Sequence, residues 1–548
     1  MNSGTMSPIG NETIVGEIFR YHEETKHHFE RYARSPGYMD WQSQPNPFRF
    51  YENTPVIELP LLKEYPRAEY PGLYRRENNR QQAFTIESIG GFLELSLGLS
   101  AWKAVGQSRW SLRMNPSSGN LHPTEAHLIL PHFSGVPGGI YHYNSFVHAL
   151  EQRAEISDET LQQVELHFGC RGFLIGLSSI FWRESWKYGE RAFRYCNHDV
   201  GHALAAVSIS ANLFGWKATY LNGLSDNTLD TVLGFDKTRY EDLAGEHPEL
   251  LCFIHPRSQL DIPRSLPQSI IAGFAKLNFT GTPNKLGRQP INWEIIYTTA
   301  DLTRKPTTAD RRFDYGDPAW IQTTTPQLSA AGIIRQRRSA TDFDRNGSVT
   351  RNQFFTILDK TLPRNGCAPF DAQLINASTH LLIFVHQVAG LTPGLYFFCR
   401  NDQDLAPLKQ LTRANFIWQS VENKFPLYLL EEGNYRQQAM MVSCHQDIAG
   451  SSAFSLGMIA HFKASITDEP FRYRHLFWET GMIGQVLYLE AEAHGLRGTG
   501  IGCFFDDAVH EILGFKDNQY QSLYHFTIGR PVEDPRLTTY PPYQHLSR

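Results

Sequence analysis

Two stretches of this chain repeat one pattern at a constant distance. An apolar run opens with Asp-Val-Gly-His at Asp199, and a second opens with Glu-Thr-Gly-Met at Glu479. Each run is followed by a short loop, an acidic residue and a Leu-Gly-Phe ending, at 233–235 and 513–515. The offset from Gly201 to Gly481 equals the offset from Gly234 to Gly514. A constant offset across a helix, a loop and a second helix indicates a duplicated domain, so one chain can supply an interface that otherwise needs a homodimer.

The bulk composition is that of a globular protein with material for two cores. The 548 residues allow two domains of roughly 250 residues each, and 41% of them are apolar. A net charge of −5 and the lack of Lys/Arg runs argue against a nucleic-acid partner. Seven scattered cysteines without a Cys-x-x-Cys motif favour a reduced, cytoplasmic protein. The sequence has no signal-peptide core and no apolar run of about 18 residues, so we expect no membrane partner.

The order of helix and strand signals indicates an α+β fold of two tandem domains, each a mixed sheet flanked by helices. The first domain is expected to have a helix at 86–99 and a strand at 125–130, which the second echoes with a strand at 381–385. A charged helix is expected at 16–34, in an arm that lies on the first domain. We therefore divide the chain into an arm, 1–70, a first domain, 71–255, a crossing segment, 256–328, and a second domain, 329–548.

The two repeated runs are apolar on most faces, which is typical of buried helices. We expect the helices near 200–214 and 480–494 to pack against each other, so that the two domains form an intramolecular pseudo-dimer. A monomer suffices for that arrangement.

The first chemical motif is a loop at 113–125, Arg-Met-Asn-Pro-Ser-Ser-Gly-Asn-Leu-His-Pro-Thr-Glu. Its serine hydroxyls and backbone N–H groups suit the close approach of a planar ligand. The alternative, an ordinary loop before a strand, is equally compatible with the residues alone.

The second motif is Arg-Gln-Arg-Arg-Ser at 335–339, which heads the second domain. Closely spaced arginines beside a serine suit a phosphate group. On its own, a solvated basic turn is the simpler explanation.

The third motif, at 183–195, places Lys187 and Tyr188 among Arg183, Arg191 and Arg194. Neighbouring cations disfavour the charged form of a lysine and the neutral form of a tyrosine, which would prepare either for proton transfer. A surface segment rich in ion pairs is the alternative.

Together, in this order and in a duplicated frame, the three motifs resemble those of the nitroreductase superfamily, and within it the SagB-type thiazole/oxazole-forming dehydrogenases. The resemblance covers most of the chain, including Tyr-His-Glu-Glu-Thr-Lys at 21–26 and Asp40-Trp41 in the arm. It implies an FMN protein, since the family members are dimers with flavin at the interface. In them an Arg-Arg-Ser element of one subunit holds the phosphate, the Pro-Ser loop comes from the other, and in the SagB-type branch a Lys-Tyr pair is implicated in chemistry.

The two copies have lost opposite halves of this pattern. The first keeps the Pro-Ser loop, but its head at 74–78 lacks Arg-Arg-Ser; the second keeps Arg-Arg-Ser, but has Phe-Asp-Ala-Gln-Leu-Ile-Asn at 370–376 in place of the loop. The surviving halves are complementary, so we expect one intact FMN site across the two domains and one degenerate site. The resemblance implies these site residues: for FMN, Arg337, Arg338, Ser339, Arg113, Asn115, Pro116, Ser117, Ser118, Gly119, Asn120, Gly500 and Gly502; for catalysis, Lys187 and Tyr188.

Two other patterns resemble known binding motifs but lack a feature that each motif requires. Gly-Thr-Gly-Ile-Gly at 498–502 follows a helix, whereas a dinucleotide fingerprint follows a strand and opens a helix. We expect it instead to be a loop beside the flavin ring. His-Glu-Glu-Thr-Lys-His at 22–27 is one residue too long for a zinc motif, so we expect no metal site.

Three functions remain open from the sequence. The first is an FMN-dependent dehydrogenase that oxidises an azoline-like heterocycle or another peptide-derived substrate, and the Lys-Tyr pair favours it. The second is an NAD(P)H-dependent nitro- or quinone reductase. The third is a non-catalytic flavin-binding component of a modification complex.

Overall fold

The repeat in the sequence becomes two seven-stranded sheets with one strand order. The computed structural model describes residues 10–74, 81–133, 135–259, 261–316, 318 and 328–546. The N-terminal sheet has the order β2-β7-β6-β5-β8-β10-β9, and the C-terminal sheet has the order β16-β17-β15-β13-β18-β20-β19. Apart from the first edge strand, both orders read third, second, first, fourth, sixth, fifth along the chain. The recorded pairings within both sheets are antiparallel.

The N-terminal sheet consists of β2 (Val56–Glu58), β5 (Thr124–Leu130), β6 (Gly139–Asn144), β7 (Ala149–Glu155), β8 (Phe173–Ser179), β9 (Trp216–Tyr220) and β10 (His247–Pro256). The C-terminal sheet consists of β13 (Thr379–Val385), β15 (Gly394–Phe398), β16 (Gln419–Glu422), β17 (Phe425–Glu432), β18 (Phe454–His461), β19 (Arg497–Ile501) and β20 (Tyr520–Gly529). The smaller strands are β1 (Tyr51–Glu52), β3 (Leu99–Val105), β4 (Ser108–Arg113), β11 (Thr282–Pro283), β12 (Val349–Thr350), β14 (Val388–Ala389) and β21 (Thr538–Tyr540).

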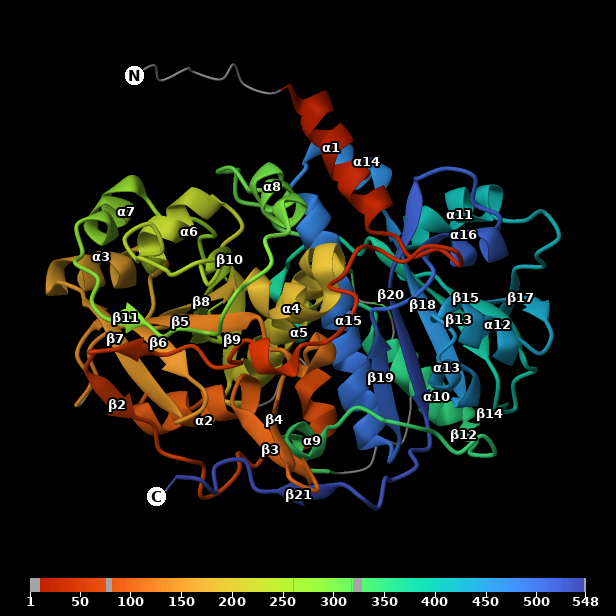
Figure 1. Ribbon diagram of the computed structural model, residues 1–548, viewed down its shortest axis with the longest axis horizontal. Coiled ribbons are helices and arrows are strands. Elements are labelled where there is room, and N and C mark those ends of the chain that lie inside the picture. Colours follow the sequence, from red (N-terminus) through yellow and green to blue (C-terminus); the bar gives the residue numbers. More distant parts are fainter. Residues whose placement is uncertain are drawn as a thin grey trace.

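Helices flank both sheets, which confirms the α+β class (Figure 1). In the N-terminal half and the crossing segment they are α2 (Ile86–Ser96), α3 (Asp158–Phe168), α4 (Phe181–Tyr188), α5 (Ala192–Leu213), α6 (Asp226–Leu233), α7 (Gln268–Ala275) and α8 (Glu294–Leu302). In the C-terminal half they are α9 (Ala330–Gln336), α10 (Arg351–Lys360), α11 (Leu405–Leu411), α12 (Arg436–Val442), α13 (Asp447–Ser451), α14 (Lys463–Asp468), α15 (Arg472–Ala493) and α16 (Asp506–Leu513).

The long helices α5 and α15 pack against each other between the two sheets, as the sequence predicts (Figure 1). Both begin well before the predicted apolar runs, and most polar residues of their first two turns, such as Arg194 and His475, are also buried. Asn197 of α5, for example, accepts a hydrogen bond of 2.8 Å from the Trp478 indole of α15. A search for apolar periodicity in the sequence misses such polar residues, because their burial depends on partners from the other half.

The two helices are closest at the repeated glycines. A methyl group at Gly201 would lie 2.1 Å from the Trp478 carbonyl oxygen, and one at Gly481 would lie 2.2 Å from the His198 carbonyl oxygen. Both clashes are with backbone, which cannot rotate away. The sequence repeat therefore marks the contact point between the halves.

We expect Gly201→Ala to lower the stability of the whole protein, because α5 and α15 must separate to admit the methyl group. Overpacking of this kind costs about 1–3 kcal/mol or more. Thermal unfolding followed by circular dichroism measures the effect. Gly16→Ala is the matched control, because Gly16 lies in helix α1, where a methyl group would meet nothing within 4 Å. That control should be neutral or stabilising, and equal melting temperatures for the two variants would contradict the close contact.

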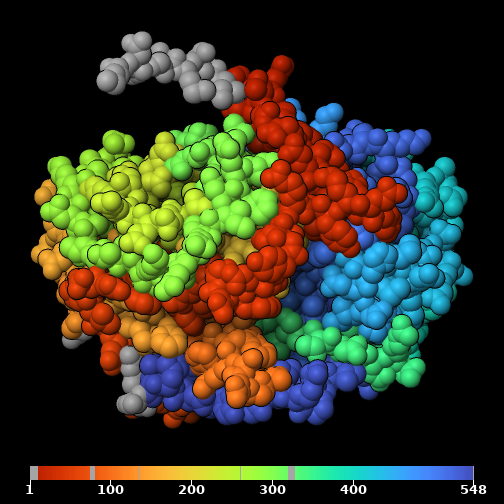
Figure 2. All heavy atoms as spheres, viewed as in Figure 1, coloured from red at the N-terminus to blue at the C-terminus, as the bar shows by residue number. Residues whose placement is uncertain are grey.

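The N-terminal arm differs from the prediction in two ways. Its helix α1 (Asn11–Glu24) ends well before the expected end at 34. The arm also contacts both halves: the Tyr21 hydroxyl donates to the Glu190 carbonyl oxygen at 2.8 Å, and the Lys26 ammonium lies 2.8 Å from a carboxylate oxygen of Asp507. In Figure 2 the red arm crosses the face where the yellow-green and blue halves meet. It binds the halves together and does not lie on the first domain alone.

The C-terminal end of the chain also crosses between the halves, since strand β21 pairs with β3 of the N-terminal half. The arm supplies β2 to the N-terminal sheet. The crossing segment contains α7 and α8, although its pattern predicts little regular structure. Residues 75–78 of the first head, and 319–327 of the crossing segment, lie outside the described residues.

Candidate active site

Residues from both halves line a cavity of about 260 Å³ beside α5. Predicted flavin-site residues from both motifs and the predicted catalytic tyrosine are among its walls. The lining residues are Pro116, Ser117, Ser118, Gly119, Tyr188, Tyr195, Asp199 and His202 from the N-terminal half, and Ser339, Gln446, Tyr488, Gly500, Ile501, Gly502, Cys503 and Tyr524 from the C-terminal half.

The Pro-Ser loop reaches the cavity because Asp199 of α5 holds it there. The Asp199 carboxylate accepts hydrogen bonds from the Ser118 backbone N–H at 3.0 Å and from the Ser118 hydroxyl at 3.2 Å. The Asn120 side chain donates to the Ser111 carbonyl oxygen and so fixes the other end of the loop. Of the predicted residues in this loop motif, Arg113, Asn115 and Asn120 are not among those that line the cavity.

The Arg-Arg-Ser element approaches the cavity from the C-terminal half. Ser339 lines it, while Arg337 is buried, lies 5.1 Å from the Tyr488 ring centroid and donates to the Arg113 carbonyl oxygen. The Arg338 guanidinium donates to the carbonyl oxygens of Arg335, Arg337 and Ser100, and the Arg338 backbone N–H donates to the Glu492 carboxylate. In the described part of the chain, neither guanidinium has a carboxylate within ion-pair distance; burial lowers the pKa of Arg338 to about 10, although the nearby Glu492 carboxylate acts in the opposite direction. Two partly desolvated cations without a close ion-pair partner are suited to binding an anion.

The glycines of 498–502 lie in a strand, β19, and the residue after it, where the sequence pattern predicts a loop. A methyl group at Gly500 would lie 1.9 Å from the Tyr524 hydroxyl, and one at Gly502 would lie 2.2 Å from the Tyr195 ring. The glycines thus make room for aromatic rings at the cavity wall. The Tyr488 hydroxyl accepts a 2.8 Å hydrogen bond from the Gly500 N–H and lies 3.1 Å from the Ser339 hydroxyl.

The Lys187–Tyr188 pair ends helix α4. Tyr188 lines the cavity, and the Lys187 ammonium, which is half-buried, lies 5.1 Å from the Tyr188 ring centroid. Burial and the nearby Glu184 raise the pKa of Tyr188 well above its usual value, so the tyrosine is a neutral phenol that can donate a proton. The expectation that neighbouring cations disfavour the neutral form of this tyrosine is therefore not met.

The three arginines of that motif bind carboxylates elsewhere. Arg183 pairs with Glu125, and Arg191 and Arg194 both pair with Asp506 at 2.9 and 2.7 Å. Because each guanidinium is directed at a carboxylate, and two of them share Asp506, the expected effect of these arginines on Lys187 is not supported by the geometry.

A pair of buried carboxyl groups, Glu184 and Asp199, lies beside the Lys-Tyr pair and was not predicted. Burial raises the pKa of Asp199 to about 7, and burial together with Asp199 raises that of Glu184 well above its usual value. Glu479, which the repeat places at the position equivalent to Asp199, instead forms an ion pair with Arg400 at 2.7 Å. The sequence does carry a signal: an acidic residue opens the apolar run in both copies, which is unusual for a buried helix.

The Asp199 carboxyl should make stability depend on pH. With a folded pKa of about 7 and an unfolded value near 3.9, the unfolded state loses its proton first, so Asp199 reduces stability as pH rises from 4 to 7. We expect Asp199→Asn to gain stability relative to the wild type across this window, by up to roughly 4 kcal/mol, and by a constant amount above it. Melting temperatures of both proteins from pH 5 to 8 measure the difference. Asp517→Asn, on the exposed surface, should show no such trend; a flat difference for Asp199→Asn would contradict the raised pKa.

The equivalent position in the other half is closed. A cavity of only about 10 Å³ lies there, between Glu479 and Met482 of α15 and the segment that replaces the Pro-Ser loop, which contributes Phe370, Leu374 and Ile375. By the offset of the repeat, Tyr220 of β9 is the counterpart of Gly500, and its ring packs against His475 and Trp478. Side chains therefore fill the space that is open in the first site.

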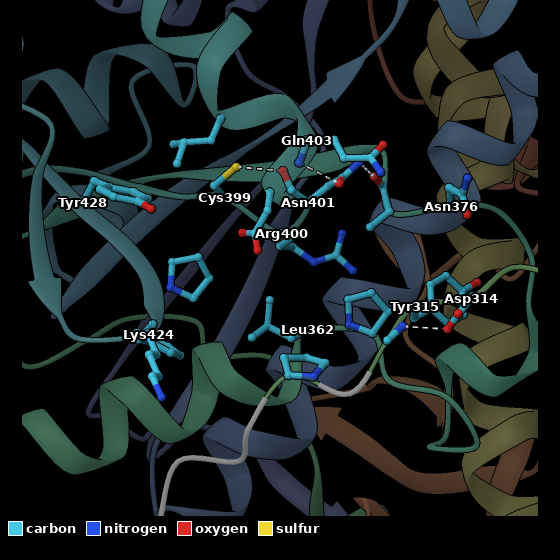
Figure 3. Close-up of a pocket in the computed structure, with 18 of the residues that line it drawn as sticks. Asp314, Tyr315, Leu362, Asn376, Cys399, Arg400, Asn401, Gln403, Lys424 and Tyr428 are labelled. Atoms are coloured by element: carbon cyan, nitrogen blue, oxygen red, sulfur yellow. Dashed lines mark hydrogen bonds between the residues drawn. The ribbon is translucent and has the colours of Figure 1, made fainter.

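A larger hollow of about 950 Å³ opens next to this closed position (Figure 3). Lys424 and Tyr428 lie at one end of the view, and Asp314 and Tyr315 at the other. Its walls come from the C-terminal half and the crossing segment. The hollow contains none of the predicted site residues, and its buried Arg400 is already paired with Glu479. The smaller cavity between the halves is therefore the better candidate for the active site.

Comparisons with known proteins agree with this architecture. The model of the Nitroreductase family matches residues 334–530. A protein from Methanocaldococcus jannaschii that carries a nitroreductase name is 26% identical over 187 residues, which are 33% of this chain and 90% of that protein. The crystal structure of a protein from Anabaena variabilis, also named as a nitroreductase, superposes with a TM-score of 0.68 at 22% identity, over 94% of this chain and 99% of that one.

No helix in the described part of the chain combines the length and the hydropathy that a membrane span requires.

The comparisons show that the chain has the fold of a solved protein named as a nitroreductase across nearly its whole length, and that its residues 334–530 match the Nitroreductase family.

Proposed function

We propose that this protein is an FMN-dependent oxidoreductase that arose by tandem duplication, with one active site between the two halves of an intramolecular pseudo-dimer. The observation that carries the proposal is the meeting of complementary motifs: the Pro-Ser loop of one half and the Arg-Arg-Ser element of the other line or flank a single cavity. The match to the Nitroreductase family and the shared fold support it.

The residues around the cavity fit FMN. Arg337 and Arg338 provide two cationic groups without a carboxylate within ion-pair distance among the described residues, and the Arg337 Nε has no hydrogen-bond acceptor there. These groups would hold the phosphate, while the Pro-Ser loop and the tyrosine-lined wall would hold the ring system. The cavity is slightly smaller than the usual lower bound for ligand pockets, about 300 Å³. The Tyr488 hydroxyl is hydrogen-bonded to the Ser339 hydroxyl and to the Gly500 N–H, and a ligand would displace it from these two partners.

When bound, FMN supplies a two-electron acceptor or donor for hydride transfer. The residues of this chain would then manage protons. Tyr188, neutral and in the cavity wall, is placed to donate or to orient a substrate atom. Lys187, one residue earlier, is the candidate base, and Asp199 can exchange a proton with the same region because burial raises its pKa to about 7, whereas burial keeps the neighbouring Glu184 in its protonated form.

The substrate proposal is a SagB-type dehydrogenation of an azoline-like heterocycle or another peptide-derived compound. The Lys187–Tyr188 pair at the cavity supports this over the NAD(P)H-dependent reductase, because removal of a substrate proton requires a positioned base. A reductase would not need a proton-transfer pair at the cavity. A purely structural flavoprotein would need neither the lysine nor the tyrosine.

We expect the purified protein to be yellow and to release one FMN per chain. Of the two positions that the repeat relates, only the first is open among the described residues; Phe370 and Leu374 leave a cavity of about 10 Å³ at its counterpart, which is too small for a second flavin. Absorption spectroscopy, followed by chromatographic identification of the released cofactor and its molar ratio to protein, tests this. A ratio of two would show that the closed site opens, and a colourless protein that does not take up added FMN would overturn the proposed function. Rapid bleaching by NAD(P)H would favour the reductase.

A further inference from the structure

Two cysteines from separate segments meet at one wall of the active-site cavity. Cys503 lines the cavity just after β19, and Cys444 lies in the turn between α12 and α13. Their thiols are close enough for each to shift the pKa of the other. Both are partly exposed, whereas Cys196, Cys252, Cys367 and Cys399 are buried.

The surrounding backbone holds the two cysteines together. The Phe505 N–H donates to the Val442 carbonyl oxygen at 2.8 Å, and the Gln446 amide, itself at the cavity, donates to the Cys503 carbonyl oxygen at 3.1 Å. Cys444 and the next residue, His445, have left-handed φ angles of 53° and 57°. Consecutive non-glycine residues in this conformation cost free energy and are concentrated at functional sites. The contact between the thiols is thus imposed by the fold.

The local charges distinguish the two thiols. The interaction with the Cys444 thiol and the nearby Arg191 lower the pKa of Cys503, and the same interaction together with burial raises the pKa of Cys444. Arg191 is fixed there, because its guanidinium pairs with Asp506 and donates to the Gly502 carbonyl oxygen at 3.3 Å. Cys503 is therefore the better thiolate and Cys444 its proton-donating neighbour, the asymmetry found in reactive dithiols.

We propose that Cys444 and Cys503 form a redox-active dithiol that exchanges two electrons with a flavin held in the cavity. The inference rests on the proposed function, since it needs that acceptor. In the oxidising direction two S–H bonds break and one S–S bond forms; two electrons pass to the oxidised flavin, and the two protons go to the flavin and to solvent. The reverse reaction returns two electrons from reduced flavin to the disulfide and restores both thiols. The dithiol would thus let the site store two electrons in addition to the two that a reduced flavin holds.

The first experiment does not use enzyme activity. Purified protein, with and without FMN, is treated with diamide, which takes two electrons and two protons from a dithiol. It is then alkylated under denaturing conditions and digested with trypsin. Cys444 and Cys503 are the single cysteines of the tryptic peptides 437–463 and 498–516. We expect these two peptides to become disulfide-linked, and we expect Cys170, partly exposed on its own after α3, to remain alkylated. Failure to link the two peptides would overturn the dithiol.

The second experiment measures electron exchange. In an anaerobic dithionite titration of the diamide-treated, desalted holoprotein, the wild type should consume about four electrons per flavin, two for the flavin and two for the disulfide. Cys503→Ser and Cys444→Ser should consume about two, and the control Cys170→Ser should match the wild type. Reoxidation of the reduced protein by a limiting amount of free flavin should restore the disulfide only in the wild type and in the control. Linked peptides together with two electrons per flavin in the wild type would overturn the exchange while leaving the flavin site intact; absence of bound flavin would instead overturn the proposed function.

Discussion

Lys187→Ala should bind FMN normally and lose substrate oxidation by about 10²- to 10⁴-fold, the range that a general base supplies. The Lys187 side chain is half-buried beside Tyr188, whose ring forms the cavity wall, while Lys187 itself is not among the lining residues. Its removal therefore leaves the residues that line the cavity in place and takes away only the proposed base. The measurement is single-turnover flavin reduction by an azoline-containing peptide.

Two controls separate chemistry from structure. Lys276→Ala removes an exposed lysine after α7 and should leave the rate unchanged. Tyr188→Phe keeps the aromatic wall but removes the proton donor, so its pH–rate profile should change in shape, whereas a merely structural tyrosine would leave the profile unaltered. Near-normal turnover of Lys187→Ala would show that the lysine is not the base, and the reductase function would then gain support.

The sequence predicted the architecture well because the repeat is long-range information. The constant offset between the two copies located both α5 and α15, and the glycines within it turned out to be their point of contact. Element boundaries were less accurate. Residues 25–34 continue the charged pattern of α1 but are not helical, because the arm turns there to reach the C-terminal half, where the His27 N–H donates to Asp506.

The candidate site was predictable in its parts but not in its electrostatics. The motif at 183–195 shows three arginines near one lysine, yet the structure pairs each arginine with a carboxylate far away in the sequence, Glu125 or Asp506. The sequence alone does not reveal such partners. For the same reason it did not reveal the carboxyl pair: Glu184 and Asp199 stand on different helices, and their proximity depends on how α4 packs against α5.

Changing both Arg337 and Arg338 to alanine should weaken FMN binding by two or more decades. Each charge-assisted contact is worth about 1.5–3 kcal/mol, and about 1.4 kcal/mol corresponds to a factor of ten in affinity. The free protein supports this magnitude, because both guanidiniums donate to carbonyl oxygens such as those of Arg113 and Ser100 and neither forms an ion pair among the described residues. An incoming phosphate would therefore gain their charge without first breaking an ion pair.

Titration of apoprotein with FMN, followed by quenching of flavin fluorescence, measures the affinity. Arg171→Ala combined with Arg239→Ala removes the same charge from the exposed surface of the N-terminal half and should bind as the wild type does. The double lysine variant, Arg337→Lys with Arg338→Lys, keeps the charge but loses the planar donor geometry, so its affinity should lie between those of the wild type and the double alanine variant. A double alanine variant that purifies fully yellow would place the phosphate elsewhere. Riboflavin, which lacks the phosphate, should bind the wild type and the double alanine variant equally; that equality would assign the lost free energy to the phosphate contact and not to a collapsed cavity.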